Sequence, residues 1–178
     1  SIFSFYATKM IATGEGGMVL SDDESLLEKI RDLRDYDEKE LYAVRYNYKM
    51  TDFQAAFGIS QLKKLFSFIK RRKEIADIYS TAFGKCDFEI PHVPSDREHI
   101  FYRYVLQMNN TEVFIDEMAQ KEISCRRPVF KPLHRYLDLP GYAATETVWE
   151  KAVSLPIYPS LTDEEITRIV ESVKSIQS

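Results

Sequence analysis

The chain reads S-F-Y-A-T-K over residues 4–9 and G-E-G-G over residues 14–17. The run I-F-S-F-Y at residues 2–6 predicts a buried β-strand, because it is rich in β-branched and aromatic side chains. Three glycines within four positions predict a turn, since glycine adopts a positive φ without strain. A returning strand is expected over residues 18–20. Lys9 therefore lies between a buried strand and a glycine-rich turn.

Two interpretations of Lys9 follow from this position. An amine withdrawn from water loses its proton more readily and becomes a nucleophile. The hydroxyl of Ser4, five residues earlier, is then a donor for a phosphate group. Alternatively, the stretch is an ordinary hairpin whose lysine points into water. The residues of this stretch alone leave both interpretations open.

A helix and then a loop are expected after the returning strand. Ser21 is the expected N-cap of the helix, because Glu24 follows three residues later as in a capping box. Residues 35–50 are polar and rich in tyrosine without a regular period, which predicts a long loop. A loop of this length inside a compact domain is usually functional.

The longest helical pattern in the chain begins at a second capping box, formed by Thr51 and Gln54. Its apolar residues keep a spacing of three to four well beyond the usual helix length. Because a helix much longer than about 25 residues is unusual in a globular domain, we expect a bend or break, and a domain boundary, near residues 65–68. The expected domains are residues 1–67 and 68–178.

The second expected domain alternates strands and helices, which predicts a small α/β unit. Its expected elements are strands at residues 100–107 and 123–127, helices at residues 111–122 and 145–153, an extended segment at residues 155–159, and a last helix that follows a third capping box at Thr162 and Glu165.

The composition is that of a globular protein, with 44% hydrophobic residues, 29% charged residues and a formal net charge of −4. Nothing in this balance indicates a nucleic-acid partner. The basic run at residues 70–73 precedes acidic residues and is expected to be a solvated helix face. No apolar run approaches the roughly 20 residues that cross a bilayer, so no membrane association is expected.

Cysteines and histidines indicate no further class of site. Cys86 and Cys125 are too few for a disulfide scaffold and lack C-x-x-C spacing, so free thiols and a cytoplasmic location are expected. The three histidines lack metal-ligand spacing, so no metal site is expected.

Four segments of the chain match the motifs of one family, in order and at compatible spacing. They are residues 4–17, residues 46–56 (Y-N-Y-K-M-T-D-F-Q-A-A), residues 132–134 (P-L-H) and residues 154–159 (S-L-P-I-Y-P). The chain resembles the DegT-type sugar-nucleotide aminotransferases, which are fold-type-I enzymes that use pyridoxal 5'-phosphate (PLP). The resemblance implies an α/β fold, in which the first expected domain ends the large PLP-binding domain and the second is the small C-terminal α/β domain.

The resemblance also implies roles for single residues. Lys9 would form the Schiff base with PLP, and Ser4 would hydrogen-bond the PLP phosphate. Asn47 would reach the phosphate of a PLP bound mainly by the neighbouring subunit, which implies a homodimer with a shared active site; without the resemblance, Asn47 would be interpreted as a turn residue. Tyr6 and His134 lie in segments that border the sugar-nucleotide site, where each is equally well explained as a packing residue.

The chain departs from the family pattern in two positions and in length. Lys49 stands where arginine is usual, so bidentate contact there would be lost, and Tyr46 stands close to a usual glycine. Such enzymes have about as much chain again before this point, and that half would carry the aspartate that pairs with the PLP ring nitrogen. Without the aspartate the ring is a poor electron sink, so this chain alone is expected to be an inactive C-terminal part.

The implied reaction converts a keto-sugar nucleotide to an amino-sugar nucleotide, with an amino acid such as L-glutamate as donor. It would serve the synthesis of cell-surface polysaccharides or secondary-metabolite sugars. A lysine at position 9 favours an aminotransferase over the related sugar dehydratases, in which that position resembles histidine. Two alternatives remain open: another fold-type-I PLP enzyme that acts on a non-nucleotide ketone, and a non-enzymatic regulator that retains the fold.

Overall fold

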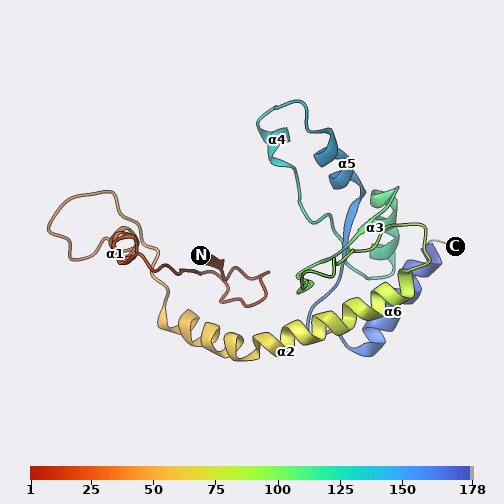
Figure 1. The fold of residues 1–178 in the computed structure, drawn as a ribbon, viewed down its shortest axis with the longest axis horizontal. Coiled ribbons are helices and arrows are strands. Elements are labelled where there is room, and N and C mark those ends of the chain that lie inside the picture. Colours follow the sequence, from red (N-terminus) through yellow and green to blue (C-terminus); the bar gives the residue numbers. More distant parts are fainter. Residues whose placement is uncertain (177–178) are drawn as a thin grey trace. The chain divides into compact units, whose positions relative to one another are not determined.

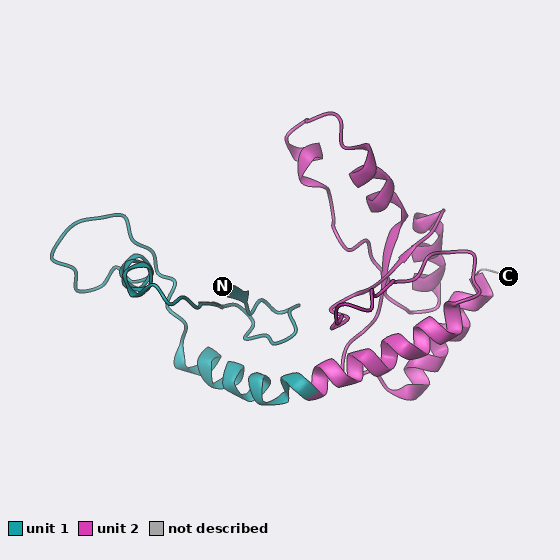
Figure 2. Ribbon diagram, viewed as in Figure 1, with its two compact units in different colours: residues 1–66 teal, residues 67–178 magenta. Residues whose placement is uncertain are grey.

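The structure is a computed structural model that describes residues 1–176, and the chain divides into two compact units (Figure 2). Unit 1 is Ser1–Phe66 and unit 2 is Ser67–Ser178, of which the last two residues lie outside the described part. The elements in chain order are β1 (Ile2–Ser4), β2 (Gly17–Val19), α1 (Glu24–Leu33), α2 (Asp52–Phe83), β3 (Tyr104–Gln107), α3 (Thr111–Gln120), α4 (Leu133–Tyr136), α5 (Ala143–Lys151), β4 (Ala152–Leu155) and α6 (Asp163–Ile176) (Figure 1).

The hairpin of unit 1 joins β1 and β2 in an antiparallel pair, with Ile2 opposite Val19 and Ser4 opposite Gly17. The predicted glycine turn is confirmed, since Gly14 and Gly16 have φ of 82° and 145°. The prediction that β1 is buried is wrong, because the side chain of Ile2 is 85% exposed. A β-rich sequence favours a strand, but burial also needs a packing partner, and this two-stranded sheet has none within residues 1–66.

Helix α1 begins later than predicted, because its N-cap is Asp23 and not Ser21. The carboxylate of Asp23 accepts from the backbone N–H of Leu26 at 3.1 Å and from the hydroxyl of Ser25 at 2.8 Å. These hydrogen bonds, the one from Ser25 first, lower the pKa of Asp23. The long loop predicted over residues 35–50 is confirmed, since no helix or strand lies between α1 and α2.

Helix α2 is one continuous helix of 32 residues, so of the predicted bend or break near residues 65–68 the break is wrong and the bend stays a prediction. No glycine or proline lies near residues 65–68 to interrupt its hydrogen bonds. The capping box at its start is confirmed: Thr51 N–H donates to Gln54 Oε1 at 3.0 Å, and Gln54 N–H donates to Thr51 Oγ1 at 3.3 Å. The buried residues of α2 all lie in unit 2, although the helix begins in unit 1.

Unit 2 is built on the antiparallel pair of β3 and β4, with Tyr104 opposite Leu155 and Gln107 opposite Ala152. The predicted strand over residues 100–107 is confirmed only over its second half. Strand β4 was not predicted, because its residues were divided between an expected helix and an expected extended segment. The expected strand over residues 123–127 is reduced to one bridge between Arg126 and Ser154.

The core of unit 2 gathers α2, α3 and α6 around this sheet, with α3 beside α6 (Figure 1). Its largest fully buried side chains are Tyr79, Tyr104, Phe83, Ile75, Leu106, Met118, Ile166, Val153 and Val173. The capping box that begins α6 is confirmed, because Thr162 N–H donates to Glu165 Oε2 at 2.9 Å and Glu165 N–H donates to Thr162 Oγ1 at 3.2 Å.

One residue of the predicted solvated basic face is buried. Arg72 is 7% exposed, and its Nη1 donates to the carbonyls of Phe101, Tyr102 and Ile157 at 3.2, 3.2 and 2.6 Å. Desolvation lowers the pKa of Arg72. The spacing of charges along a helix could not show this, because the three carbonyls come from distant parts of the chain.

Both cysteines are free thiols, as predicted. Burial raises the pKa of the Cys125 thiol to about 12. No helix within residues 1–176 combines the length and the apolar character that a membrane crossing requires.

Candidate cofactor site

Lys9 lies on a short loop of residues 6–12 that leaves the end of β1. The loop is closed at its neck, where Thr13 N–H donates to the carbonyl of Phe5 at 2.9 Å, and Phe5 N–H donates to the carbonyl of Gly16 at 2.8 Å. A turn near its tip is held by Lys9 N–H, which donates to the carbonyl of Tyr6 at 2.9 Å. The Lys9 side chain is exposed, and so is strand β1. Within residues 1–66, the Lys9 amine is therefore not withdrawn from water as the sequence predicted.

Ser4 ends β1 at the start of the same loop. Its Oγ accepts from the backbone N–H of Tyr6 at 3.4 Å. A hydroxyl that accepts one hydrogen bond retains its own proton for a second partner, so Ser4 can donate to an anion. Tyr6 is 47% exposed on the loop.

Asn47 lies in the segment that leads from α1 to α2. Its neighbours Tyr46 and Tyr48 stack with ring centroids 4.9 Å apart and planes 3° apart. Their backbone N–H groups donate to the carbonyls of Leu33 and Arg34 at 2.8 and 2.9 Å. Asn47 lies between these two residues in the chain and is exposed.

The loop before Asn47 is held by ion pairs. Lys49 contacts Asp35 at 2.9 Å and Asp37 at 2.8 Å. The hydrogen bond from Lys49 lowers the pKa of Asp35, and the two carboxylates raise the pKa of Lys49. Lys49 therefore closes this loop through its two acidic partners.

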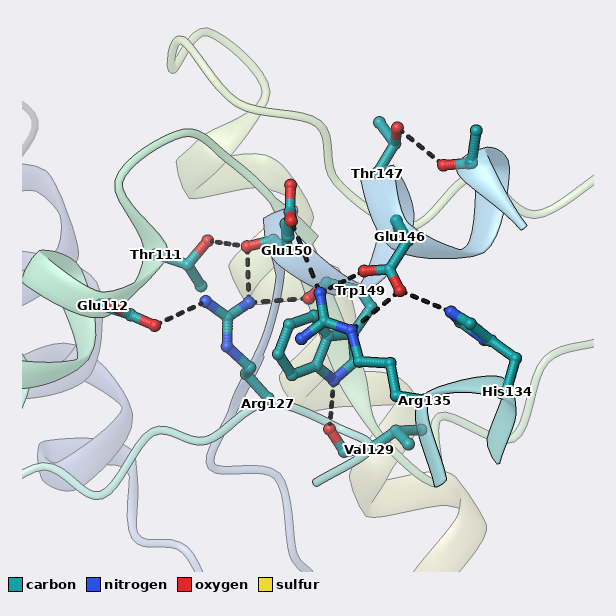
Figure 3. A network of polar contacts seen from close by, with 11 residues as sticks. Thr111, Glu112, Arg127, Val129, His134, Arg135, Glu146, Thr147, Trp149 and Glu150 are labelled. Carbon is teal, nitrogen blue, oxygen red and sulfur yellow. Dashed lines mark hydrogen bonds and ion pairs between the residues drawn. The ribbon is translucent and has the colours of Figure 1, made fainter. Parts of the chain in front are cut away.

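His134 belongs to unit 2, where it lies in a network of polar contacts (Figure 3). Its Nε2 lies 2.5 Å from Glu146 Oε1, and its ring stacks on Tyr142 with centroids 4.9 Å apart. The His134 side chain is 10% exposed. One ring nitrogen of His134 thus contacts a carboxylate. The sequence did not indicate Glu146 as its partner, because the two residues lie 12 positions apart and belong to no recognisable motif.

Glu146 also pairs with Arg135 through both carboxylate oxygens (Figure 3). These bonds, with Arg135 as the larger cause and His134 as the next, lower the pKa of Glu146 to about 2. The guanidinium carbons of Arg127 and Arg135 lie 4.6 and 4.2 Å from the ring centroid of Trp149. The network therefore joins α4 to α5.

Tyr6 and Lys9 lie on one loop and Ser4 lies at the end of β1 that precedes it, whereas Asn47 lies on a separate segment of the same unit and His134 lies in the other unit. The groups of unit 1 fit PLP chemically, because a primary amine can bind an aldehyde and neutral donors suit a phosphate. Among residues 1–176, no three His, Cys, Asp or Glu side chains are placed to hold a metal ion.

Comparison with known proteins identifies relatives of this chain. It is 37% identical to the spore coat polysaccharide biosynthesis protein SpsC of Bacillus subtilis, over 98% of this chain and 52% of that protein. It is 32% identical to the GDP-perosamine synthase of Escherichia coli O157:H7, over 100% of this chain and 52% of that protein.

Solved structures show the same fold. PseC of Helicobacter pylori, an aminotransferase involved in the biosynthesis of pseudoaminic acid, has a TM-score of 0.90 at 26% identity, over 99% of this chain and 53% of that chain. The likeness confirms the expected fold class, and the chain spans about half the length of the relatives it matches. Because the model of the DegT/DnrJ/EryC1/StrS aminotransferase family matches residues 1–174, this chain belongs to that family.

Proposed function

We propose that the full-length protein that contains these residues is a PLP-dependent aminotransferase, which converts a keto-sugar nucleotide to an amino-sugar nucleotide with an amino acid, such as L-glutamate, as donor. The observation that carries the proposal is the closed loop that begins at Ser4 and carries Lys9, in a chain that matches an aminotransferase family over residues 1–174. The relatives named for perosamine and pseudoaminic acid support the substrate class.

Each residue of the site has a defined task in this proposal. The Lys9 amine would hold PLP through its aldehyde carbon and, when free, would serve as the base and acid that moves a proton at the substrate α-carbon. When bound, PLP supplies the electron sink that stabilises charge on that carbon. Ser4 donates to the cofactor phosphate, and Asn47 donates to the phosphate held mainly by the partner subunit of a homodimer.

Tyr6 and His134 are assigned to the border of the sugar-nucleotide site. The contact between His134 Nε2 and Glu146 fixes the ring, so His134 has only Nδ1 left for a substrate atom. In the same proposal, residues 1–67 end the large PLP-binding domain and residues 68–178 form the small domain.

Replacing Lys9 tests the cofactor assignment. Full-length protein incubated with PLP and borohydride should gain the mass of one reduced cofactor, and Lys9→Ala should abolish that gain. Lys29→Ala, which removes an exposed lysine of α1, is the matched control and should label fully. Undiminished labelling of Lys9→Ala would overturn the assignment.

Substrate panels test the substrate class. The full-length protein, supplied with L-glutamate, should convert at least one keto-sugar nucleotide to its amine, measured by mass spectrometry. Turnover of a non-nucleotide ketone alone would instead identify another PLP enzyme of this fold. Residues 1–178 alone should show no turnover with any substrate in the panel, because the expected partner of the ring nitrogen lies in the other half.

Asn47→Ala tests the shared site. Loss of one hydrogen bond to a charged group should weaken PLP binding by about 1–2 kcal/mol, or roughly 5- to 30-fold in the dissociation constant. An unchanged dissociation constant would show that Asn47 has only a structural role.

A further inference from the structure

Thr13 is the only buried residue of unit 1, all of whose residues 1–66 the structure describes, and it is 7% exposed. Its Oγ1 donates to the carbonyl of Glu15 at 2.5 Å. A Cβ added at Gly16 would lie 2.7 Å from Thr13 Oγ1, and one added at Gly58 of α2 would lie 3.0 Å from Thr13 Cγ2. The Thr13 side chain is therefore enclosed between the glycine turn and α2.

The carbonyl of Glu15 accepts a second hydrogen bond, from Gln54 Nε2 at 3.1 Å. The other end of the Gln54 amide is also occupied, because Oε1 accepts from the backbone N–H of Thr51 at 3.0 Å and from its hydroxyl at 3.1 Å. These bonds fix which way the amide points. One peptide carbonyl thus joins the glycine turn to the start of α2, across 39 residues of sequence.

This arrangement acts on Lys9 through the neck of its loop. The backbone N–H of Thr13 donates to the carbonyl of Phe5 at the neck of the loop, and its hydroxyl donates to the carbonyl of Glu15. Hydrogen bonds therefore fix both the backbone and the side chain of Thr13. The same carbonyl is bonded by Gln54, in the first turn of α2, only a few residues after Asn47. The Lys9 loop and the Asn47 segment are therefore joined through one hydrogen-bonded hub of Thr13, Glu15 and Gln54.

We propose that Thr13 and Gln54 are positioning residues for the cofactor, which hold the Lys9 loop in a fixed relation to the Asn47 segment. The inference rests on the proposed function, since it assigns these residues to the same site. Neither side chain needs to touch the cofactor. Their effect is to keep the Lys9 amine from sampling other positions of the loop, which raises the fraction of molecules ready to bind the aldehyde.

Three substitutions in the full-length protein separate the hub from simple packing. Thr13→Val keeps the shape and removes the hydroxyl, whereas Thr13→Ser keeps the hydroxyl and removes the methyl group that faces Gly58. Gln54→Glu keeps the oxygen that caps Thr51 and removes the N–H that reaches Glu15. Thr81→Val and Gln120→Glu, at exposed positions of α2 and α3, are the matched controls.

Two readouts are measured on each protein: hydrogen exchange of residues 5–16, and the dissociation constant for PLP from borohydride trapping at Lys9. Thr13→Val and Gln54→Glu should each speed exchange of these amides about tenfold and weaken PLP binding about tenfold, the effect of one lost hydrogen bond. Thr13→Ser and both controls should stay within about twofold of the wild type by the same reasoning.

The proposal is overturned if Thr13→Val and Gln54→Glu exchange and bind PLP as the wild type does. It is also overturned if Thr13→Ser is impaired as much as Thr13→Val, because packing would then be the cause. Gln54→Glu keeps the helix cap and so decides the matter even if Thr13→Val folds poorly. Failure of the wild type to trap PLP at Lys9 would refute the proposed function instead, and exchange alone would then decide whether the hub holds the loop.

Discussion

Unit 1 and unit 2 differ in what holds them together. The described part of unit 2, residues 67–176, buries 19 hydrophobic side chains in one core, whereas residues 1–66 bury only Thr13. The hairpin and the first turns of α2 in unit 1 leave large apolar side chains in water, such as Ile2 at 85%, Phe53 at 84% and Phe66 at 85%. An open groove of about 1270 Å³ lies between the hairpin, α1 and the Tyr46–Met50 segment.

The two units therefore differ in the interactions that stabilise them. Unit 1 carries the proposed cofactor residues on turns and caps that are held by hydrogen bonds, each of which adds only about 0.5–1.5 kcal/mol. Unit 2 has an apolar core whose burial, at about 25 cal/mol per Å², can sustain a fold. One unit is thus packed around an apolar core, and the other leaves large apolar side chains exposed.

Hydrogen exchange should show the largest effect. In residues 1–178 alone, core amides of unit 2, such as Leu106 and Val153, should exchange at least about 1000-fold more slowly than those of Met18 and Val19 in β2, given typical domain stabilities. In the full-length protein the β2 amides should gain protection. Equal exchange in the two units would contradict the comparison.

The same substitution, leucine to alanine, tests whether the two units differ in apolar packing. Leu106→Ala, at a fully buried position of β3, should lower the free energy of unfolding by about 2–5 kcal/mol, because it leaves a cavity. Leu62→Ala, at a position of α2 that is 57% exposed, should change it by less than about 0.5 kcal/mol. Chemical denaturation of residues 1–178 measures both, and similar values would show that unit 1 has a core.

Replacing one arginine in each unit tests whether a buried cation contributes more to stability than an exposed one. Arg72→Met removes the donor for three carbonyls of unit 2 and should destabilise it by about 2 kcal/mol. Arg31→Met, in α1, removes ion pairs that are largely exposed and should give no resolvable change in the denaturation midpoint. A neutral Arg72→Met would mean that the relief of desolvation offsets the lost hydrogen bonds.

The Glu146 network should give the smallest effect, seen at acidic pH. Because the folded-state pKa of Glu146 is lowered to about 2 from 4.5, its contribution to stability is fully present above about pH 4.5 and is lost as the pH falls toward 2. Trp149, the single tryptophan, lies against Arg135, and its fluorescence should change in that window. Glu146→Gln should flatten the change, whereas the exposed Glu164→Gln should not.

Much of the fold could be predicted because its signals are local. The capping boxes at Thr51 and Thr162, the glycine turn and the length of the long loop all depend on residues a few positions apart. Strand β4 was missed because its pairing with β3 lies outside any local window. The N-cap of α1 was misplaced because Ser21 and Asp23 are both good caps, and only the hydrogen bond to Leu26 decides between them.

The sequence by itself determined the family, the position of Lys9 before a glycine turn, and the capping boxes that begin α2 and α6, since spacing and side-chain chemistry encode these directly. Only the tertiary structure decided that β1 is exposed and that Arg72 is buried. It also decided that Glu146 contacts His134, and that Thr13 and Gln54 donate hydrogen bonds to the same carbonyl. The physical reason is that burial and hydrogen bonding depend on residues brought together from 12 to 85 positions apart, which no local pattern records.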